Sequence, residues 1–390
     1  MKINKSLSSP FRFVILLGIV SLFSDFTYEG ARSINGVYLG FLGASAAVVG
    51  VVSGLGELLG YSLRILSGFL SDKTQKYWLF TIFGYFINLL AVPLLAIACN
   101  WKVAVLLLIL ERIGKAIRTP SRDVMLSYAG SQLGSGWAFG LHEAMDQIGA
   151  TMGPIFVTIV LLINGNFRLG YAFLAIPALI ALLTLIFARF SYPEPKEMIK
   201  KDKKIEFKGF NKSFYLYLGS VCFIAAGFVD FPLIAYHFQE KGVLLSNLIP
   251  LFYALAMVSD AFSALFFGKL FDKFGLSAML VGLLFSLFFS PLVFLFSWQI
   301  ALVGMVFWGI GMGIQESILR AQISKLIVPE KRGSAFGIFN TLYGFSWFLG
   351  SATMGILYSH SVLYLVLFSF CSQIFAAFII LFLIKKNSCR

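Results

Sequence analysis

The stretch Gly68-Phe-Leu-Ser-Asp72-Lys73 returns 200 residues later as Gly268-Lys-Leu-Phe-Asp272-Lys273-Phe-Gly275. Each copy interrupts a long apolar run, and each lies between the second and third such run of its half of the chain. A Gly-x-x-x-Asp-Lys turn that recurs at the same position in each half indicates two copies of a single unit. The repeat therefore predicts a membrane protein built from two similar halves.

The composition of the chain indicates that lipid is the solvent for most of its surface. Of 390 residues, 59% are hydrophobic and 13% are charged, which is more apolar than a soluble domain can bury. Apolar runs of about 20 residues, the length that a helix needs to cross a bilayer, recur along the whole sequence. These runs cover residues 13–38, 46–66, 78–98, 103–125, 137–162, 169–190, 214–236, 248–267, 277–295, 299–323, 334–358 and 362–384. They are too long for barrel strands, so we expect an all-α integral membrane protein with twelve transmembrane helices.

The net charge of +13 is distributed unevenly along the chain. Most lysines and arginines lie at the termini or in the connections after even-numbered runs, including Lys73, Lys273 and the cluster 200–212. This positive-inside pattern predicts that both termini are cytoplasmic, in the inner (plasma) membrane of the cell. The basic loops then face lipid headgroups and not nucleic acid. We expect a monomer.

The one long polar stretch separates two halves of six runs each. Residues 191–212 carry two prolines and a lysine-rich segment, which is typical of a cytoplasmic linker. Ala138-Phe-Gly140 in the first half recurs as Ala335-Phe-Gly337 in the second. We therefore expect an N-terminal six-helix bundle at 1–190 and a C-terminal bundle at 213–390. Parallel repeats of this kind are related by a pseudo-two-fold axis along the membrane normal.

These features resemble the major facilitator superfamily over essentially the whole chain. The family pattern between helices 2 and 3 is roughly Gly-x-Leu-Ala-Asp-Arg-x-Gly-Arg-Lys; Gly68, Leu70 and Asp72 match it, and Gln75 replaces the second glycine. The resemblance implies a secondary active transporter that works by alternating access. It also implies that the repeated turn latches the inner gate, through Gly68, Asp72, Gly268 and Asp272. The alternative is a plain tight turn with positive-inside lysines.

Charged residues within the apolar runs are the candidates for chemistry, because an unpaired charge that faces lipid costs at least about 2.5 kcal/mol. Asp25, Glu29 and Arg32 are spaced by four and three, which places them on one face of helix 1. Helix 5 adds His142, Glu143 and Asp146. We expect the four acids and His142 to be candidate proton carriers. A closed network of Asp25 and Glu29 with Arg32 or a helix 4 arginine is an equally good and compatible interpretation.

Further intramembrane charges are candidates for a substrate cavity, together with Arg32. Arg112 resembles the arginine that the family often keeps in helix 4, and Arg118 follows it toward the cytoplasm. These cations could attract an anionic substrate or balance the acids of helices 1 and 5. Asp230 and Glu316 are the corresponding candidates in the second half.

Helix 5 also contains Gly149-Ala-Thr-Met-Gly153-Pro154. This segment resembles the family's antiporter motif, in which small residues allow close packing and proline bends the helix. An ordinary kinked membrane helix would show the same residues. The resemblance implies proton-coupled efflux of a small solute by antiport. The alternatives are proton-coupled import of a small polar or anionic solute, or a non-transporting membrane receptor. The sequence shows no spacing typical of an enzyme, a metal site or a cofactor.

Overall fold

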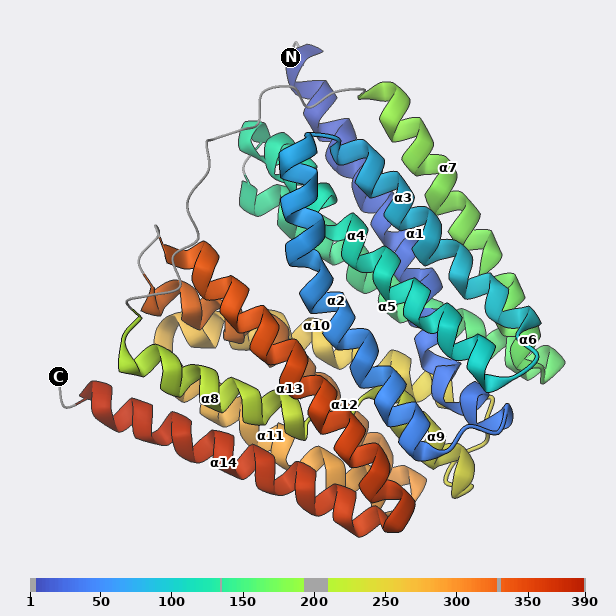
Figure 1. Cartoon of the computed structure of the whole chain (residues 1–390), viewed down its shortest axis with the longest axis vertical. Helices are drawn as coiled ribbons and strands as arrows, with labels where there is room; N and C mark the ends of the chain where they lie inside the picture. The colour runs from blue at the N-terminus through green and yellow to red at the C-terminus, as the bar shows by residue number, and fades with distance from the viewer. Residues whose placement is uncertain (1–4, 134, 193–209, 328–330, 389–390) are drawn as a thin grey trace. The chain divides into compact units, whose positions relative to one another are not determined.

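The computed structural model describes residues 5–133, 135–192, 210–327 and 331–388, and within these ranges the chain forms helices and no strand. The all-α prediction is confirmed. Most of the predicted linker, 193–209, lies outside the described residues. The elements of the first half are α1 (Lys5–Phe41), α2 (Ala46–Thr74), α3 (Tyr77–Leu94), η1 (Leu95–Ile97), α4 (Trp101–Leu133), α5 (Ser135–Asn164), α6 (Phe167–Phe173) and α7 (Ala175–Ser191). Those of the second half are α8 (Lys212–Gly227), α9 (Phe231–Glu240), α10 (Ile249–Phe274), α11 (Leu276–Phe294), α12 (Trp298–Leu326), α13 (Arg332–His360) and α14 (Val362–Ser388) (Figure 1).

Each of the twelve apolar runs falls on this helical chain. Ten stretches of the described residues are long and apolar enough to cross a membrane, by length and composition alone. The two other long helices, α4 and α13, do not meet that criterion. For α4 the reason is its charge, since Glu111, Arg112, Lys115 and Arg118 fall within two turns of its centre.

The structure corrects the predicted continuity of the run 214–236. The helix stops at Gly227 and resumes at Phe231, so that three residues without helical structure separate α8 from α9. Pro232 stands in the first turn of α9, where the missing N–H of proline is tolerated.

The described chain separates into two compact units. Unit 1 comprises Met1–Ile34 and Leu59–Asp202, and unit 2 comprises Asn35–Leu58 and Lys203–Arg390. The last turns of α1 and the first half of α2 thus belong to unit 2. The units differ by that segment from the predicted six-helix bundles at 1–190 and 213–390, and the division into two such bundles joined by a linker stays a prediction.

Glycines bring the helices of unit 1 into close contact. A Cβ atom on Gly153 of α5 would lie 2.9 Å from the carbonyl carbon of Phe26 and 3.0 Å from the amide nitrogen of Gly30, both on α1. Gly84 of α3 and Gly114 of α4 meet in the same way, with each Cβ 2.7 Å from the other's carbonyl oxygen. Such backbone-to-backbone packing is the usual means of association between membrane helices.

In unit 2, α12 packs against α10 through a glycine row. Cβ atoms added to Gly309 and Gly313 would come within 3 Å of backbone or side-chain atoms of α10, and Gly311 lies against Ser286 of α11. The helices α8, α13 and α14 run side by side in this unit (Figure 1). The close contacts fix the helices that surround the break between α8 and α9.

Each copy of the opening motif ends its helix at a residue with positive φ, but the connections that follow differ, with two residues between α2 and α3 and one between α10 and α11. Gln75 and Gly275 occupy equivalent positions and both have positive φ, 59° and 57°. The Asp72 carboxylate accepts a hydrogen bond from the Tyr77 hydroxyl at 3.2 Å, which ties the end of α2 to the start of α3. Gly68 lies against Pro120, with a Cβ distance of 3.4 Å.

The glycine of the second copy has no such neighbour. A Cβ atom on Gly268 would meet no described atom within 4 Å, so Gly68 packs closely against another helix and Gly268 does not. Asp272 is exposed near the end of α10. A role of these residues in gating stays a prediction.

The positive φ at Gln75 predicts that glycine is the better residue there. L-residues with left-handed backbone lose roughly 1 kcal/mol relative to glycine, so Gln75→Gly is expected to raise the melting temperature of the detergent-solubilised protein. Gly275→Ala, the matched change in the second copy, is expected to lower it. Gly268→Ala serves as the control for a glycine with open space around it. An equal or lower melting temperature for Gln75→Gly would contradict this account of the turn.

Candidate functional site

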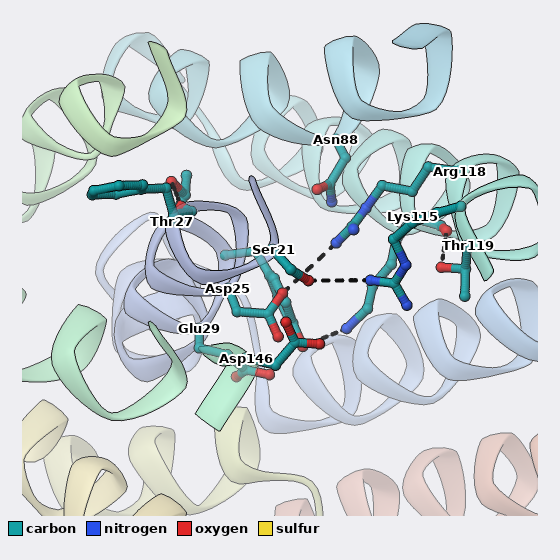
Figure 2. Close-up of polar contacts among 12 residues, drawn as sticks. Ser21, Asp25, Thr27, Glu29, Asn88, Lys115, Arg118, Thr119 and Asp146 are labelled. Carbon is teal, nitrogen blue, oxygen red and sulfur yellow. Dashed lines mark hydrogen bonds and ion pairs between the residues drawn. The ribbon is translucent and has the colours of Figure 1, made fainter. Parts of the chain in front are cut away.

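The acidic face of α1 lies within unit 1 and pairs with two different cations. Asp25 Oδ1 is 3.8 Å from Nη2 of Arg118 on α4. Glu29 Oε1 is 3.8 Å from Nη1 of Arg32, one turn along the same helix. Figure 2 shows Asp25 and Glu29 turned toward the α4 residues Lys115 and Arg118, with Asp146 close by. Both partners proposed from the sequence, Arg32 and a helix 4 arginine, are therefore used.

Cationic side chains of α4 recur at spacings of three and four residues, which places them along one side of the helix. Arg118 is buried, and its guanidinium lies 4.2 Å from the centre of the Tyr85 ring of α3. The Lys115 ammonium lies 3.7 Å from the centre of the Tyr28 ring of α1 and donates to the Tyr28 hydroxyl. Arg118 and Lys115 are thus each held against an aromatic ring. The carboxylate nearest to Arg118, that of Asp25, lies 3.8 Å away.

The remaining α4 charges are held by local partners. Arg112 Nε is 3.3 Å from Glu111 Oε2, and the Asn88 side-chain amide donates to Glu111 Oε1 at 2.7 Å. Arg122 forms a close pair with Asp123, at 2.9 Å. It also donates to the Ser21 hydroxyl of α1 at 3.2 Å. Arg112 and Arg122 thus pair with acids of α4 itself, whereas the predicted balancing of the acids of helices 1 and 5 stays a prediction for them.

The three candidate residues predicted on α5, His142, Glu143 and Asp146, differ in their burial. His142 is buried, with its Nε2 3.7 Å from Asp146 Oδ2. Glu143 is exposed. The helix face that carries Asp146 continues into Gly149 and Gly153, which pack against α1. Asp146 therefore belongs to the α1–α4–α5 cluster.

The candidates of the second half lie in unit 2. The buried Asp230 carboxylate accepts hydrogen bonds from Trp347 Nε1 at 3.0 Å and from the Ser351 hydroxyl at 2.6 Å. Glu316 and Arg320 are exposed on α12. Gly153 and Pro154 stand inside the unbroken helix α5.

Several contributors to the cluster were not found from the sequence. Tyr28, Tyr85, Asn88 and Ser21 position the charged groups through rings, an amide and a hydroxyl. Asn88 carried a signal, since it is an amide within an otherwise apolar run. Tyrosines and serines are too common in such helices to stand out without the packing.

The cluster in unit 1 gathers acidic and basic side chains of α1, α4 and α5. Asp25 lies 3.8 Å from Arg118 of α4 and Glu29 lies 3.8 Å from Arg32 of α1, and Figure 2 shows Asp146 close by. Within the described residues, no group of three His, Cys, Asp or Glu side chains is placed to hold a metal ion. Intramembrane ionisable groups of this kind mark substrate or ion pathways, which defines the class as a membrane transporter.

Comparisons with known proteins also indicate a membrane transporter. Residues 14–351 match the family model described as Major Facilitator Superfamily. An uncharacterized protein of Mycobacterium tuberculosis is 37% identical over 361 residues, covering 91% of this chain and 88% of the relative. An uncharacterized MFS-type transporter of Methanocaldococcus jannaschii is 29% identical over 387 residues, covering 95% of this chain and 94% of the relative. The chain belongs to the Major Facilitator Superfamily.

Solved structures show the same fold at low sequence identity. A POT family transporter in complex with a thioalcohol-conjugated peptide superposes with a TM-score of 0.78 at 14% identity, covering 97% of this chain and 96% of that chain. The nucleoside transporter NupG gives 0.72 at 15% identity, covering 96% and 99%. A bacterial homologue of the lysosomal transporter Spinster gives 0.75 at 15% identity, covering 97% of each. These structures show the fold, and membership of the Major Facilitator Superfamily makes the chain a multi-pass membrane transporter and not an enzyme.

Proposed function

We propose that the protein exports a small solute in exchange for protons. The observation that carries this proposal is the pair of Asp25 with the buried Arg118, next to Asp146, at the packed contact of α1, α4 and α5. A proton on Asp25 cancels the charge that faces Arg118. The guanidinium is then free to form other contacts, so the charge pattern of the cluster depends on the protonation of one carboxyl group.

Exchange in the export direction is supported by α5. Gly149 and Gly153 place α5 directly on α1, within one turn of Asp25 and Glu29, and Gly153-Pro154 resembles the antiporter motif. Movement of α5 along α1 would therefore change the surroundings of both acids. In this proposal, proton loading of α1 and the rearrangement of the α1–α5 contact are one step of alternating access.

Import of an anionic solute together with a proton is the second candidate. Among the described residues, Nε and Nη1 of Arg118 have no hydrogen-bond partner, and a guanidinium with two available N–H groups suits a carboxylate or phosphate. In that case protonation of Asp25 and binding of the anion favour each other. In the antiport case, solute and proton exclude each other.

Flux under an imposed pH gradient separates the two candidates. Compounds that raise the melting temperature of the purified protein identify solutes for proteoliposome assays. With the cytoplasmic face inward, antiport predicts that a solute gradient out of the vesicle drives protons in, detected with an internal pH dye. Under the same outward solute gradient, symport predicts that protons leave the vesicle together with the solute. Solute flux that no pH gradient alters, for any stabilising compound, would refute proton coupling.

The lysine distribution supports a placement in the inner membrane with both termini cytoplasmic, and we propose a monomer as the functional unit. Reagent labelling of single introduced cysteines in intact cells tests the orientation. Cysteines near Lys73 and Lys273 are expected to react only after the membrane is made permeable. Labelling of either site in intact cells would reverse the proposed topology.

A further inference from the structure

One face of α3 carries a row of buried polar side chains inside a predicted membrane span. They follow one another at intervals of four, four and three residues, which places them along a single side of the helix. These residues are Tyr77, Thr81, Tyr85 and Asn88. The row begins at the exposed Asp72, whose carboxylate accepts a hydrogen bond from the Tyr77 hydroxyl at 3.2 Å. It therefore leads from the turn of the opening motif into the interior of unit 1.

Two neighbouring helices turn polar groups toward this row. The guanidinium of Arg118 on α4 lies 4.2 Å from the centre of the Tyr85 ring, and Ser121 follows one turn later on α4. Val20 of α1 belongs to the same buried cluster as Tyr85. Ser24 lies one turn after Val20, on the same face of α1. Polar groups of α1, α3 and α4 thus meet within unit 1.

Four buried hydroxyl groups in this region have no hydrogen-bond partner among the described residues. They are 0% exposed and belong to Ser24, Thr81, Tyr85 and Ser121. Serine and threonine in helices often donate to the carbonyl four residues earlier, as Thr27 of α1 and Thr119 of α4 do at 2.7 Å. The hydroxyls of the region do not. Buried water is the usual partner of such groups, and it takes two to four hydrogen bonds.

We call these four residues, together with Tyr77, the polar seam. Its hydroxyl-bearing residues on α3 are four positions apart, which is about 6 Å along the helix axis. One water molecule with a hydrogen bond of about 2.8 Å on each side spans that distance. The side chains of a helix also lean toward its N-terminus, so the Tyr85 hydroxyl leans toward Thr81. The spacing therefore suits a chain of alternating hydroxyls and waters.

The polar seam ends at Asp25, which directly follows Ser24 in α1. The charged groups around Asp25 come from its own helix, from α4 and from α5, namely Glu29, Lys115, Arg118, Arg122 and Asp146 (Figure 2). Water that reaches Ser24 therefore reaches the carboxyl group that we propose as the proton carrier.

We propose that the polar seam binds water and forms the path by which the proton of Asp25 leaves for the cytoplasm, with its opening at Asp72 and Tyr77. The O–H bond of the Asp25 carboxyl group breaks as an O–H bond forms on a water beside Ser24. Each water or hydroxyl along the seam then accepts one proton and passes another on, and the last water releases a proton to the cytoplasm. This inference rests on the proposed proton coupling and orientation. It applies to export and import alike, because both release the proton at the cytoplasmic face.

X-ray radiolytic footprinting of the reconstituted full-length protein tests whether the seam holds water, because radicals formed from bound water oxidise the side chains beside it. Tyr85 and Tyr217 are a matched pair. Both are 0% exposed, but the Tyr217 hydroxyl donates to the Leu319 carbonyl at 2.8 Å. We expect oxidation of Tyr85 and none above background for Tyr217. Oxidation of Tyr85 that does not exceed that of Tyr217 would overturn the path.

Proton flux into proteoliposomes, followed with an internal pH dye, tests whether the seam conducts. The double substitution Thr81→Val and Ser121→Ala removes two hydroxyls and no charge. We expect coupled proton flux to slow about tenfold or more, since a lost hydrogen bond is worth about that factor in a rate. Exchange of labelled for unlabelled solute at equilibrium is expected to stay unchanged. Each single substitution should give a smaller effect on proton flux.

Thr158→Val is the matched control. It removes a buried threonine hydroxyl of α5, which donates to the Pro154 carbonyl at 2.9 Å, and it is expected to leave both rates unchanged. Unchanged proton flux in the double variant, with loss of flux in Asp25→Asn, would overturn the path and leave the proposed function intact. Absence of coupled flux from the unmodified protein would instead refute the proposed function, and with it the path as a proton route.

Discussion

Gly153→Leu is expected to prevent assembly of unit 1. The added Cβ alone would lie 2.9 Å from the Phe26 carbonyl carbon and 3.0 Å from the Gly30 nitrogen, and both contacts are backbone atoms of α1 that cannot rotate away. Relief requires the whole of α5 to shift from α1, at a cost of more than about 3 kcal/mol. The expected result is the loss of a monodisperse peak in size-exclusion chromatography and of thermal unfolding cooperativity.

Gly140→Leu provides the matched control on the same helix. An added Cβ there meets no described atom within 4 Å, so the same change of side chain is expected to leave yield and melting temperature close to those of the unmodified protein. Gly149→Leu should behave like Gly153→Leu, since its Cβ would lie 3.0 Å from the Phe26 nitrogen. Normal assembly of Gly153→Leu would mean that α5 does not pack on α1 as described.

Arg118→Ala is expected to destabilise the protein by about 3 kcal/mol, because removing one member of a buried pair leaves the other charge without compensation. Arg118 is 1% exposed and contributes both the contact with Asp25 and the stacking on Tyr85. Thermal unfolding in detergent should show a large fall in melting temperature. Arg189→Ala, which removes an exposed arginine at the end of α7, is expected to change stability by less than about 0.5 kcal/mol.

The double variant tests whether the loss arises from the pair. Adding Asp25→Asn to Arg118→Ala removes the uncompensated carboxylate, so part of the lost stability should return. The melting temperature of the double variant is expected to lie between those of Arg118→Ala and the unmodified protein. Strictly additive losses for the two substitutions would show that Asp25 and Arg118 do not interact.

The fold class followed from the sequence because lipid imposes a simple rule, namely that long apolar runs must be helices. The break at 228–230 could not be located in this way. Its position depends on Trp308, Ser369 and Trp347, which come from helices distant in sequence. Pro232 was the one local signal for a break in the helix. Proline alone does not locate a break, because Pro154 stands inside the unbroken helix α5.

The candidate site was predictable only in part, because helix spacing is local whereas the partners depend on packing. The spacing of Asp25, Glu29 and Arg32 fixes their common helix face, and the structure brings that face to α4. The choice of partner depends on how α1, α3 and α4 pack. Sequence alone could not show that Arg118 stacks on Tyr85, that Lys115 lies on Tyr28, or that Glu143 is exposed while His142 is buried.

We propose that the Asp25 carboxyl couples solute movement to protons, and a comparison of two transport modes tests this coupling most directly. Proteoliposomes receive a stabilising compound in radiolabelled form, with and without an imposed pH gradient. The unmodified protein and Glu240→Gln, which changes an exposed acid at the end of α9, should move the compound against its gradient when the pH gradient is present. Asp25→Asn should still exchange labelled for unlabelled compound at equilibrium but should lose the gradient-driven movement. Gradient-driven movement that survives Asp25→Asn would contradict the claim.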